Sequence, residues 1–233
     1  MTAAVVPLEK YHAYLNSQFG MSAAERAAQN RRFRRTAVTL SRLCGARAIP
    51  IGHCLADRLS AVGGGGPWAV FDDNLVKQIL ADHDLPQRLA RFMPEDVPSL
   101  VDDALCELLG VHPSDWTMFQ HTADTIYRLA ALGRVVIVGR GGHRITCGMP
   151  SVLHVRLVGG LDRRVVYMRR ALGFGEAEAR NHVQKTDRAR RRYVMAHFDR
   201  DIENPLDYDL VLNTDSLSDE EAARAIAGLV LRE

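Results

Sequence analysis

The sequence predicts an α/β domain in which helices cover a parallel sheet of five strands. Five short apolar segments alternate with longer segments of helical periodicity, the order that is typical of parallel sheets covered on both faces. At 233 residues and 47% hydrophobic content, the chain can bury a full core as one domain. The predicted strands lie at residues 36–40, 68–71, 135–138, 152–157 and 209–212.

Residues 1–35 are predicted to form an N-terminal helical extension that precedes a domain spanning residues 36–233. Ser22 and Glu25 have the spacing of a capping box, which starts an alanine-rich helix. That helix ends in the basic run 31–35. Basic runs at helix ends are more often solvated than bound to nucleic acid, so we assign this run no chemistry.

Helices are predicted between and after the strands. Pro50 stands near the first turn of the first helix, where a missing N–H is tolerated. Residues 73–132 are predicted to be a helical insertion broken at four prolines. The remaining helices are expected at residues 50–59, 161–172, 175–198 and 218–230.

Charge is distributed unevenly along the chain. Residues 163–200 hold eleven basic and four acidic side chains, whereas residues 71–124 hold three basic and eleven acidic ones. This arrangement suits a polyanionic ligand approached from one side, although two solvated helical faces of opposite sign would give the same counts. All but three of the 30 basic residues are arginines, so a phosphate site would be built mostly from planar guanidinium groups.

The cysteines and the hydropathy pattern indicate a cytoplasmic protein. The cysteines form no C-x-x-C pair and no zinc-finger spacing with histidine, which favours reduced thiols in a reducing compartment and no protein-bound metal. The chain contains no apolar run of about eighteen residues and no secretory signal. The four cysteines are Cys44, Cys54, Cys106 and Cys147.

The loop after the first strand, Ser41 to Gly52, is where a phosphate loop belongs, because ligands of open parallel sheets bind at the carboxyl ends of the strands. Such a loop needs glycines, so that backbone N–H groups can turn onto phosphate oxygens, and a cationic side chain inside the next helix. Gly45 meets the first need.

Polar residues also follow the second and third strands. Asp72 ends the second strand, where a carboxylate could contact a ligand or cap a helix. Gly139, Arg140, Gly141 and Gly142 end the third. A dinucleotide-binding fingerprint would need a glycine at Arg144, so we favour an arginine loop whose fork clamps phosphate oxygens.

A long helix near residues 175–200 carries paired charges. Asp187 and Arg190 are three residues apart and share a helical face, and so do Arg188 and Arg191. Taken alone, this helix could equally be a solvated basic helix or one that contacts RNA.

In this order the segments resemble the cytidylate kinase-like nucleoside monophosphate kinases, over about residues 36–230. The resemblance is carried by Ser41-Arg42 before the loop, the Gly-Arg loop at Arg140, the Asp-x-x-Arg of Asp187 and Arg190, and the tail 207–214. It implies a P-loop kinase-like three-layer sandwich. In such a fold the insertion 73–132 binds the acceptor nucleotide, and residues 175–200 form an arginine-rich lid.

The resemblance also implies roles for individual residues. The acceptor phosphate would lie between Arg140 and Arg190, and the acceptor nucleoside beside Asp72 and Asp187. Arg163 would reach back to phosphate, and Arg188 and Arg191 would neutralise the moving phosphoryl group. The residues expected to bind ATP are Gly45, Ala46, Arg47, Ala48, Asn213 and Thr214.

The phosphate loop departs from the family pattern. Arg47 and Ala48 stand where glycines are expected, Ile49 stands at the cationic position, and Pro50 removes a backbone donor. Loss of two contacts at roughly 1.5–3 kcal/mol each would lower ATP affinity by about a hundredfold or more. An inward-turned Arg47 is one way in which the charge could be restored. Val183 stands where these kinases often carry an arginine, and Lys185 is the candidate substitute.

The expected reaction is ATP-Mg²⁺ plus CMP or dCMP giving ADP and the diphosphate. The main alternative is a catalytically impaired, kinase-like protein that binds a nucleotide for regulation or assembly. A nucleic-acid binder is the least favoured interpretation. The expected partners are small nucleotides, with no membrane, and self-association is left open.

Overall fold

The computed structural model describes residues 14, 17, 18, 21–62, 66–72, 115–139 and 141–232. Its elements in chain order are α2 (Ala23–Gln29), η1 (Asn30–Arg32), β1 (Ala37–Arg42), α3 (Ala48–Val62), β2 (Ala69–Phe71), α7 (Asp115–Leu132), β3 (Val135–Val138), α8 (Gly142–Ile145), β4 (Val152–Val158), α9 (Leu161–Leu172), α10 (Glu176–Phe198), η2 (Pro205–Asp207), β5 (Leu210–Asn213) and α11 (Asp219–Val230).

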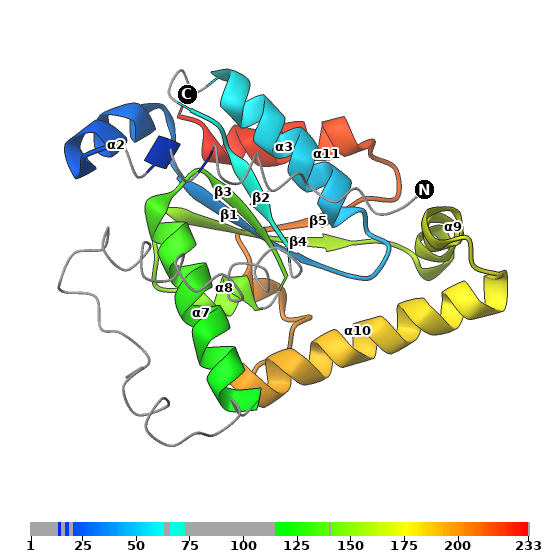
Figure 1. The fold of residues 1–233 in the computed structure, drawn as a ribbon. Helices are drawn as coiled ribbons and strands as arrows, with labels where there is room; N and C mark the ends of the chain where they lie inside the picture. Colours follow the sequence, from blue (N-terminus) through cyan, green and yellow to red (C-terminus); the bar gives the residue numbers. More distant parts are fainter. Residues whose placement is uncertain are drawn as a thin grey trace.

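The five strands form one parallel sheet in the order β2-β3-β1-β4-β5 (Figure 1). The chain passes from β3 to β4 across β1, so the direction of winding changes at the central strand. Ligands of such sheets bind in the crevice that this change opens at the carboxyl ends of the strands. The predicted α/β fold with a five-stranded parallel sheet is confirmed.

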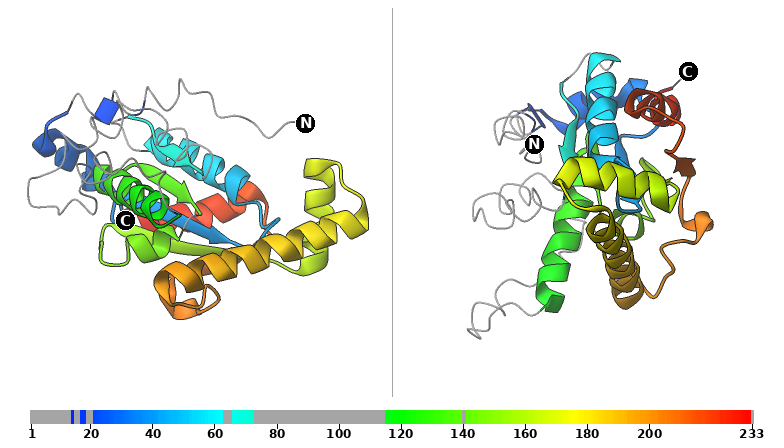
Figure 2. Two further views of the ribbon diagram at one scale, coloured as in Figure 1. Left: turned by 60° about the horizontal axis from the view of Figure 1, so that its bottom comes forward. Right: turned by 90° about the vertical axis from the view of Figure 1, so that its right-hand side faces the viewer.

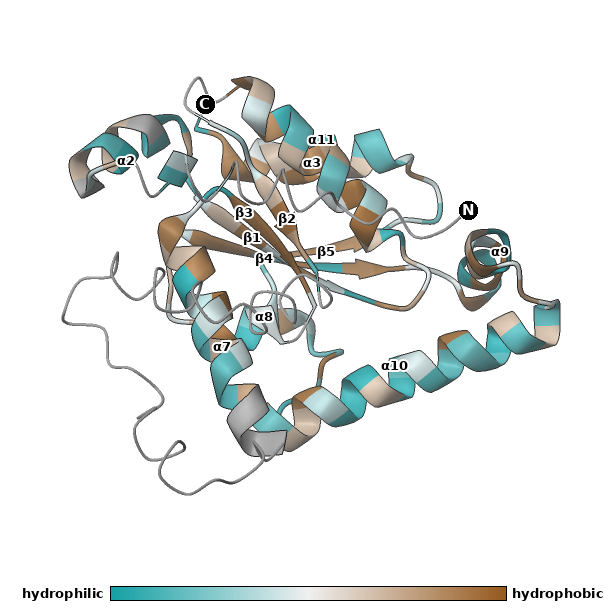
Figure 3. Ribbon diagram, viewed as in Figure 1, coloured by the Kyte–Doolittle hydropathy of each residue, from teal (hydrophilic) through white to brown (hydrophobic). Residues whose placement is uncertain are grey.

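Alternating side chains of the strands supply two cores. In β3, Val136 and Val138 point to the face covered by α3 and α11, whereas Val135 and Ile137 point to the face of α7. A strand that is buried on both faces must be apolar throughout, which explains the continuous valine and isoleucine run. Figure 3 shows the strands as the most hydrophobic part of the ribbon.

The long helix α10 runs past the carboxyl ends of the strands instead of packing on a face (Figures 1 and 2). Its first half packs against α9, and the two helices enclose a small third core together with the loop after β1. In that core Cys44 from the loop meets Val165 of α9 and Ala179 and Val183 of α10. One face of α10 is therefore held against the loop where the sequence predicts phosphate binding.

The described residues of the N-terminal segment are tied to the domain. The capping box of Ser22 and Glu25 is present, as the sequence predicts. The hydroxyl of Tyr14 donates to the carbonyl of Gly133 at 2.6 Å, and Phe33 lies in the core beside Trp68.

The predicted helices agree closely with the structure where it describes them. The helix at 161–172 has the predicted bounds, and those at 175–198 and 218–230 begin one residue late. The helix predicted at 50–59 begins at Ala48 and continues to Val62. The four-residue α8 was not predicted. Of the insertion, the part at 73–114 lies outside the described residues, and α7 accounts for the rest.

Candidate functional site

A cavity of about 580 Å³ lies at the carboxyl end of the sheet, between β1, the loop after β3 and one side of α10. It is placed where the topology predicts a ligand. Its volume is within the range of small-molecule sites. It is lined by Thr39, Leu40, Ser41, Arg42, Gly139, Gly141, Gly142, His143, His182, Lys185, Thr186, Ala189, Arg190, Tyr193, Val194 and Ile202.

Behind the lining residues Ser41 and His143, a buried polar network joins β1 to β4. Ser41 lies opposite Arg156 in the strand register, and the Arg156 guanidinium donates to the Ser41 hydroxyl at 2.8 Å. The Tyr208 hydroxyl lies 3.3 Å from the Ser41 oxygen and 3.3 Å from Nε2 of His143. Arg156 is 3% exposed, and no carboxylate among the described residues pairs with it. A buried guanidinium therefore lies directly behind the Ser41 side chain that lines the cavity, which favours an anionic ligand on this side.

His143 and Tyr208 of this network are neutral near pH 7. Burial lowers the pKa of His143 from 6.5 to about 3, and His154, Arg144 and Arg156 add to the effect. Burial likewise raises the pKa of Tyr208. A neutral imidazole and a protonated phenol can each donate a hydrogen bond without adding charge.

The other wall of the cavity is one face of α10. Thr186 and Arg190 are one turn apart and both line the cavity, with Lys185 at its exposed rim. The Arg190 guanidinium lies 3.4 Å from the backbone carbonyl of Arg42, so it crosses from α10 to the end of β1. Arg190 therefore lines the cavity, and its contact with an acceptor phosphate stays a prediction.

The glycines of the loop after β3 permit a close approach to α10. Gly141 has φ +70°, and a Cβ there would lie 2.5 Å from the Phe198 ring, so any larger residue would be strained and would collide. Gly139 and Gly141 both line the cavity. Arg140 between them lies outside the described residues, and its contact with the acceptor phosphate stays a prediction.

The loop after β1 is packed against the side chain and backbone of Arg164 from α9. Gly45 has φ +82°, and a Cβ there would lie 2.7 Å from the Arg164 carbonyl oxygen. The Arg164 guanidinium donates to the Cys44 carbonyl at 2.9 Å. Burial raises the pKa of the Cys44 thiol, which therefore stays protonated near pH 7. The glycine at the family's first position is thus required by packing in this chain.

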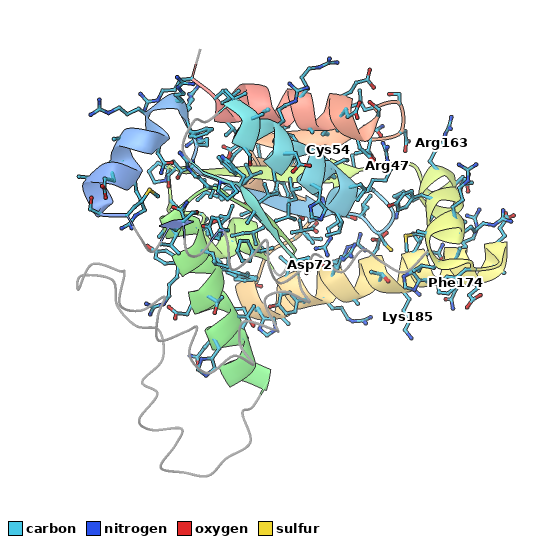
Figure 4. The ribbon with its side chains drawn as sticks, turned by 45° about the horizontal axis from the view of Figure 1, so that its top comes forward. Arg47, Cys54, Asp72, Arg163, Phe174 and Lys185 are labelled. Atoms are coloured by element: carbon cyan, nitrogen blue, oxygen red, sulfur yellow. The ribbon has the colours of Figure 1, made fainter. Side chains whose placement is uncertain are left out.

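Arg47 turns toward the loop between β5 and α11 (Figure 4). Its guanidinium donates to the carbonyls of Thr214, at 2.6 Å, and Leu217, and pairs with Asp219 at 2.7 Å. Three acceptors thus hold a side chain that stands where the family has a glycine. The structure brings Arg47 and Thr214 together, but the charge of Arg47 is committed to protein groups.

Asp187 bridges the loop and α9. One carboxylate oxygen accepts the Cys44 N–H at 2.7 Å, and the other accepts from Arg164 at 2.7 Å. Asp187 does not line the cavity, although Arg190 three residues later does. The Asp187 carboxylate is thus bonded within the protein, and its expected contact with the acceptor nucleoside stays a prediction.

Other predicted residues lie apart from the cavity. Arg163 is exposed and points outward from α9 (Figure 4). Arg188 is exposed and bonds to no other described residue, and Arg191 pairs with Glu203. Asp72 directly follows β2 and lies above α10 in the view of Figure 4.

The remaining predicted residues belong to the two loops already described. Ala46 is buried and its N–H donates to the Leu43 carbonyl at 3.2 Å. Ala48 begins α3, and Asn213 accepts from the N–H of Asp215 at 3.0 Å. Their roles toward ATP stay predictions.

Sequence reasoning missed Arg164, Arg156 and His143. A signal for Arg164 was present, because it shares the helical stripe of Leu161, Val165 and Met168 that packs into the third core. Arg156 interrupts a buried strand, where a charged side chain is rare without a function or a partner. Nothing in the sequence around His143 marks it as a cavity residue.

The described part of the chain contains no cluster of three or more histidine, cysteine or carboxylate groups that could hold a metal. Nor does any helix within it have the length and apolarity needed to cross a membrane.

The model of the cytidylate kinase-like family matches residues 37–216. Of the solved structures, 22 chains match. An uncharacterized protein from Eubacterium ventriosum ATCC 27560 is 17% identical, with a TM-score of 0.57, over 83% of this chain and 97% of that one. The shikimate kinase from Bacteroides thetaiotaomicron is 13% identical, with a TM-score of 0.50, over the same shares of the two chains. At these identities the likeness shows the fold alone, which is P-loop kinase-like. No curated protein matches the chain.

Proposed function

The chain belongs to the cytidylate kinase-like family, and we propose that it phosphorylates a nucleoside monophosphate, in the first instance CMP or dCMP, with ATP. The observation that carries this proposal is the cavity at the carboxyl edge of the sheet. Arg190 lines one wall, the glycines flanking Arg140 line another, and the buried guanidinium of Arg156 lies behind the lining residue Ser41. A cavity with these walls fits a small guest that carries a phosphate.

The acceptor would lie with its phosphate between Arg190 and Arg140, and with its nucleoside toward Asp72. Two guanidinium groups from separate elements fix the position of a phosphate and neutralise its charge. One acceptor oxygen would attack the γ-phosphorus of ATP, and the bond from that phosphorus to the β,γ-bridging oxygen would break, releasing ADP. Mg²⁺ bound to the donor phosphates would offset their charge, and Arg188 and Arg191 would assist after a shift of α10.

The loop after β1 fits ATP poorly as it stands. The Cys44 N–H and the Ala46 N–H are already bonded to Asp187 and Leu43, and Arg47 is held by three acceptors. Donor binding therefore requires these contacts to rearrange. Thr214 and Asn213 would lie beside the adenine only after that change.

The same loop favours a second function, in which the protein binds a nucleoside monophosphate without transferring phosphate. Binding without transfer requires the acceptor cavity but does not require the loop after β1 to hold ATP. It would suit a regulatory or assembly role.

A coupled assay of ADP release over the common nucleoside monophosphates distinguishes the two functions. We expect turnover that is highest with CMP or dCMP, and that falls by about a hundredfold in Arg190→Ala because one phosphate clamp is removed. Arg192→Ala is the matched control, since Arg192 is an exposed arginine of the same helix and does not line the cavity. Turnover of the unaltered protein no greater than that of Arg190→Ala would end the claim of transfer.

A further inference from the structure

Two hydrogen-bond donors converge on the Asp187 carboxylate at the loop after β1. The Cys44 N–H donates to one oxygen at 2.7 Å, and the Arg164 guanidinium donates to the other at 2.7 Å. The donors come from the loop and from α9, while the carboxylate comes from α10. The ion pair is largely shielded from solvent: the Arg164 side chain is 9% exposed and the Asp187 side chain is 19% exposed.

A backbone N–H and an arginine fork are the groups that proteins use to hold phosphate oxygens. The loop after β1 is also where the family resemblance and the sheet topology place a donor phosphate. In this structure the anion between the two donors is the protein's own Asp187 carboxylate. The Asp187 carboxylate thus has the charge and the acceptor oxygens that a phosphoryl group would bring.

We propose that the Cys44 N–H and Arg164 form an anion site for a phosphoryl group of a donor nucleotide, and that Asp187 fills this site when the donor is absent. This inference rests on the proposed function for its donor side. Asp187 is then an internal competitor. It holds α10 against the loop until a phosphate displaces it.

Displacement at this site is coupled to the acceptor cavity through α10. Asp187 and Arg190 are less than one turn apart on the same helix, and Arg190 reaches the Arg42 carbonyl at the cavity. Release of Asp187 frees this part of α10 to change its position over the cavity. Because coupling between sites is reciprocal, acceptor binding should in turn change the affinity for donor phosphate.

The test measures the binding of inorganic tripolyphosphate by calorimetry to the full chain and to Asp187→Asn. Asparagine keeps the size of the side chain but removes the charge that competes with phosphate. We expect Asp187→Asn to bind tripolyphosphate about tenfold more tightly than the unaltered protein. Adding Arg164→Met to Asp187→Asn should abolish that gain.

Asp162→Asn is the matched control. Asp162 of α9 pairs with Arg180 of α10 at 2.7 Å, so it joins the same two helices, but its side chain is 85% exposed. Its removal should change tripolyphosphate affinity by less than about twofold, as expected of an exposed ion pair.

The inference is overturned if Asp187→Asn and Asp187→Ala, each shown to be folded by its melting curve, bind tripolyphosphate no more tightly than the unaltered protein. A structural ion pair would give that result together with a lower melting temperature. Failure of the acceptor side of the proposed function gives a different result, since CMP would then bind to none of the variants. Tighter tripolyphosphate binding without CMP binding would keep the anion site and reject the acceptor cavity.

Discussion

Replacement of His143 by glutamine should flatten the pH dependence of stability on the acid side. His143 is 2% exposed, lies 3.3 Å from the Tyr208 hydroxyl and has Arg144, Arg156 and His154 in its surroundings. Burial, with these charges, lowers its pKa from 6.5 to about 3. Glutamine keeps a polar group at this position but does not titrate.

The sign of the effect follows from where the proton binds. As the pH falls below 6.5, the unfolded chain protonates this imidazole, whereas the folded protein does not until about pH 3. The unfolded state is therefore favoured progressively between these two values. At about pH 5 the loss attributable to His143 is about 2 kcal/mol relative to about pH 7.5.

Urea unfolding at these two pH values measures the difference. The unaltered protein should lose about 2 kcal/mol more stability on acidification than His143→Gln. The pKa of His154 is also lowered, chiefly by burial, and both proteins keep this histidine. Equal losses in the two proteins, or an imidazole of His143 that titrates near 6.5 by NMR, would refute the assigned environment.

Two further substitutions test the packing around the site. Gly141→Ala should lower stability by about 1–3 kcal/mol, because it combines a positive φ with a collision at the Phe198 ring. Phe198→Leu should recover part of this loss in the double variant. Thermal melts of the two single variants and the double variant measure the effect, and additive losses of stability would contradict it. Arg47→Ala should lower stability by about 1–3 kcal/mol, because it leaves the Thr214 and Leu217 carbonyls without their donor. Arg47→Lys should recover less than half of this loss, because one ammonium group cannot replace a guanidinium that bonds to three acceptors. Full recovery of stability by lysine in urea unfolding would contradict the three-acceptor arrangement.

Much of the fold could be predicted because it depends on local patterns. The run at 135–138 is apolar at every position, which is the pattern of a strand buried on both faces. It forms β3, which pairs with the central strand β1. The helix at 161–172 ends at Gly173, which adopts the left-handed conformation expected of a helix end. Such signals act within one element and need no knowledge of its neighbours.

The site was less predictable because it depends on which side of α10 meets which partner. Residues three apart on a helix share a broad face but are rotated by about 60°. Asp187 and Arg190 were assigned to one ligand on that basis. In the structure this rotation directs Asp187 to Cys44 and Arg190 to the cavity beside Arg42.

The same limit applies to α9 and to the loop. Arg163 was selected over Arg164, although only Arg164 lies on the apolar stripe that faces the loop. The substitution of glycine by Arg47 could be read from the sequence as a damaged phosphate loop. The hydrogen-bond partners of Arg47 could not be predicted from the sequence, because they lie more than 160 residues away along the chain.

The most direct test of the acceptor cavity compares the binding of CMP and cytidine by calorimetry, in the unaltered protein and in Arg190→Ala. The two ligands differ only by the phosphate. We expect CMP to bind at least about a hundredfold more tightly than cytidine, and Arg190→Ala to remove most of that difference. Equal affinities for CMP and cytidine, or a preference for CMP that persists in Arg190→Ala, would contradict an arginine-lined phosphate site at the carboxyl edge of the sheet.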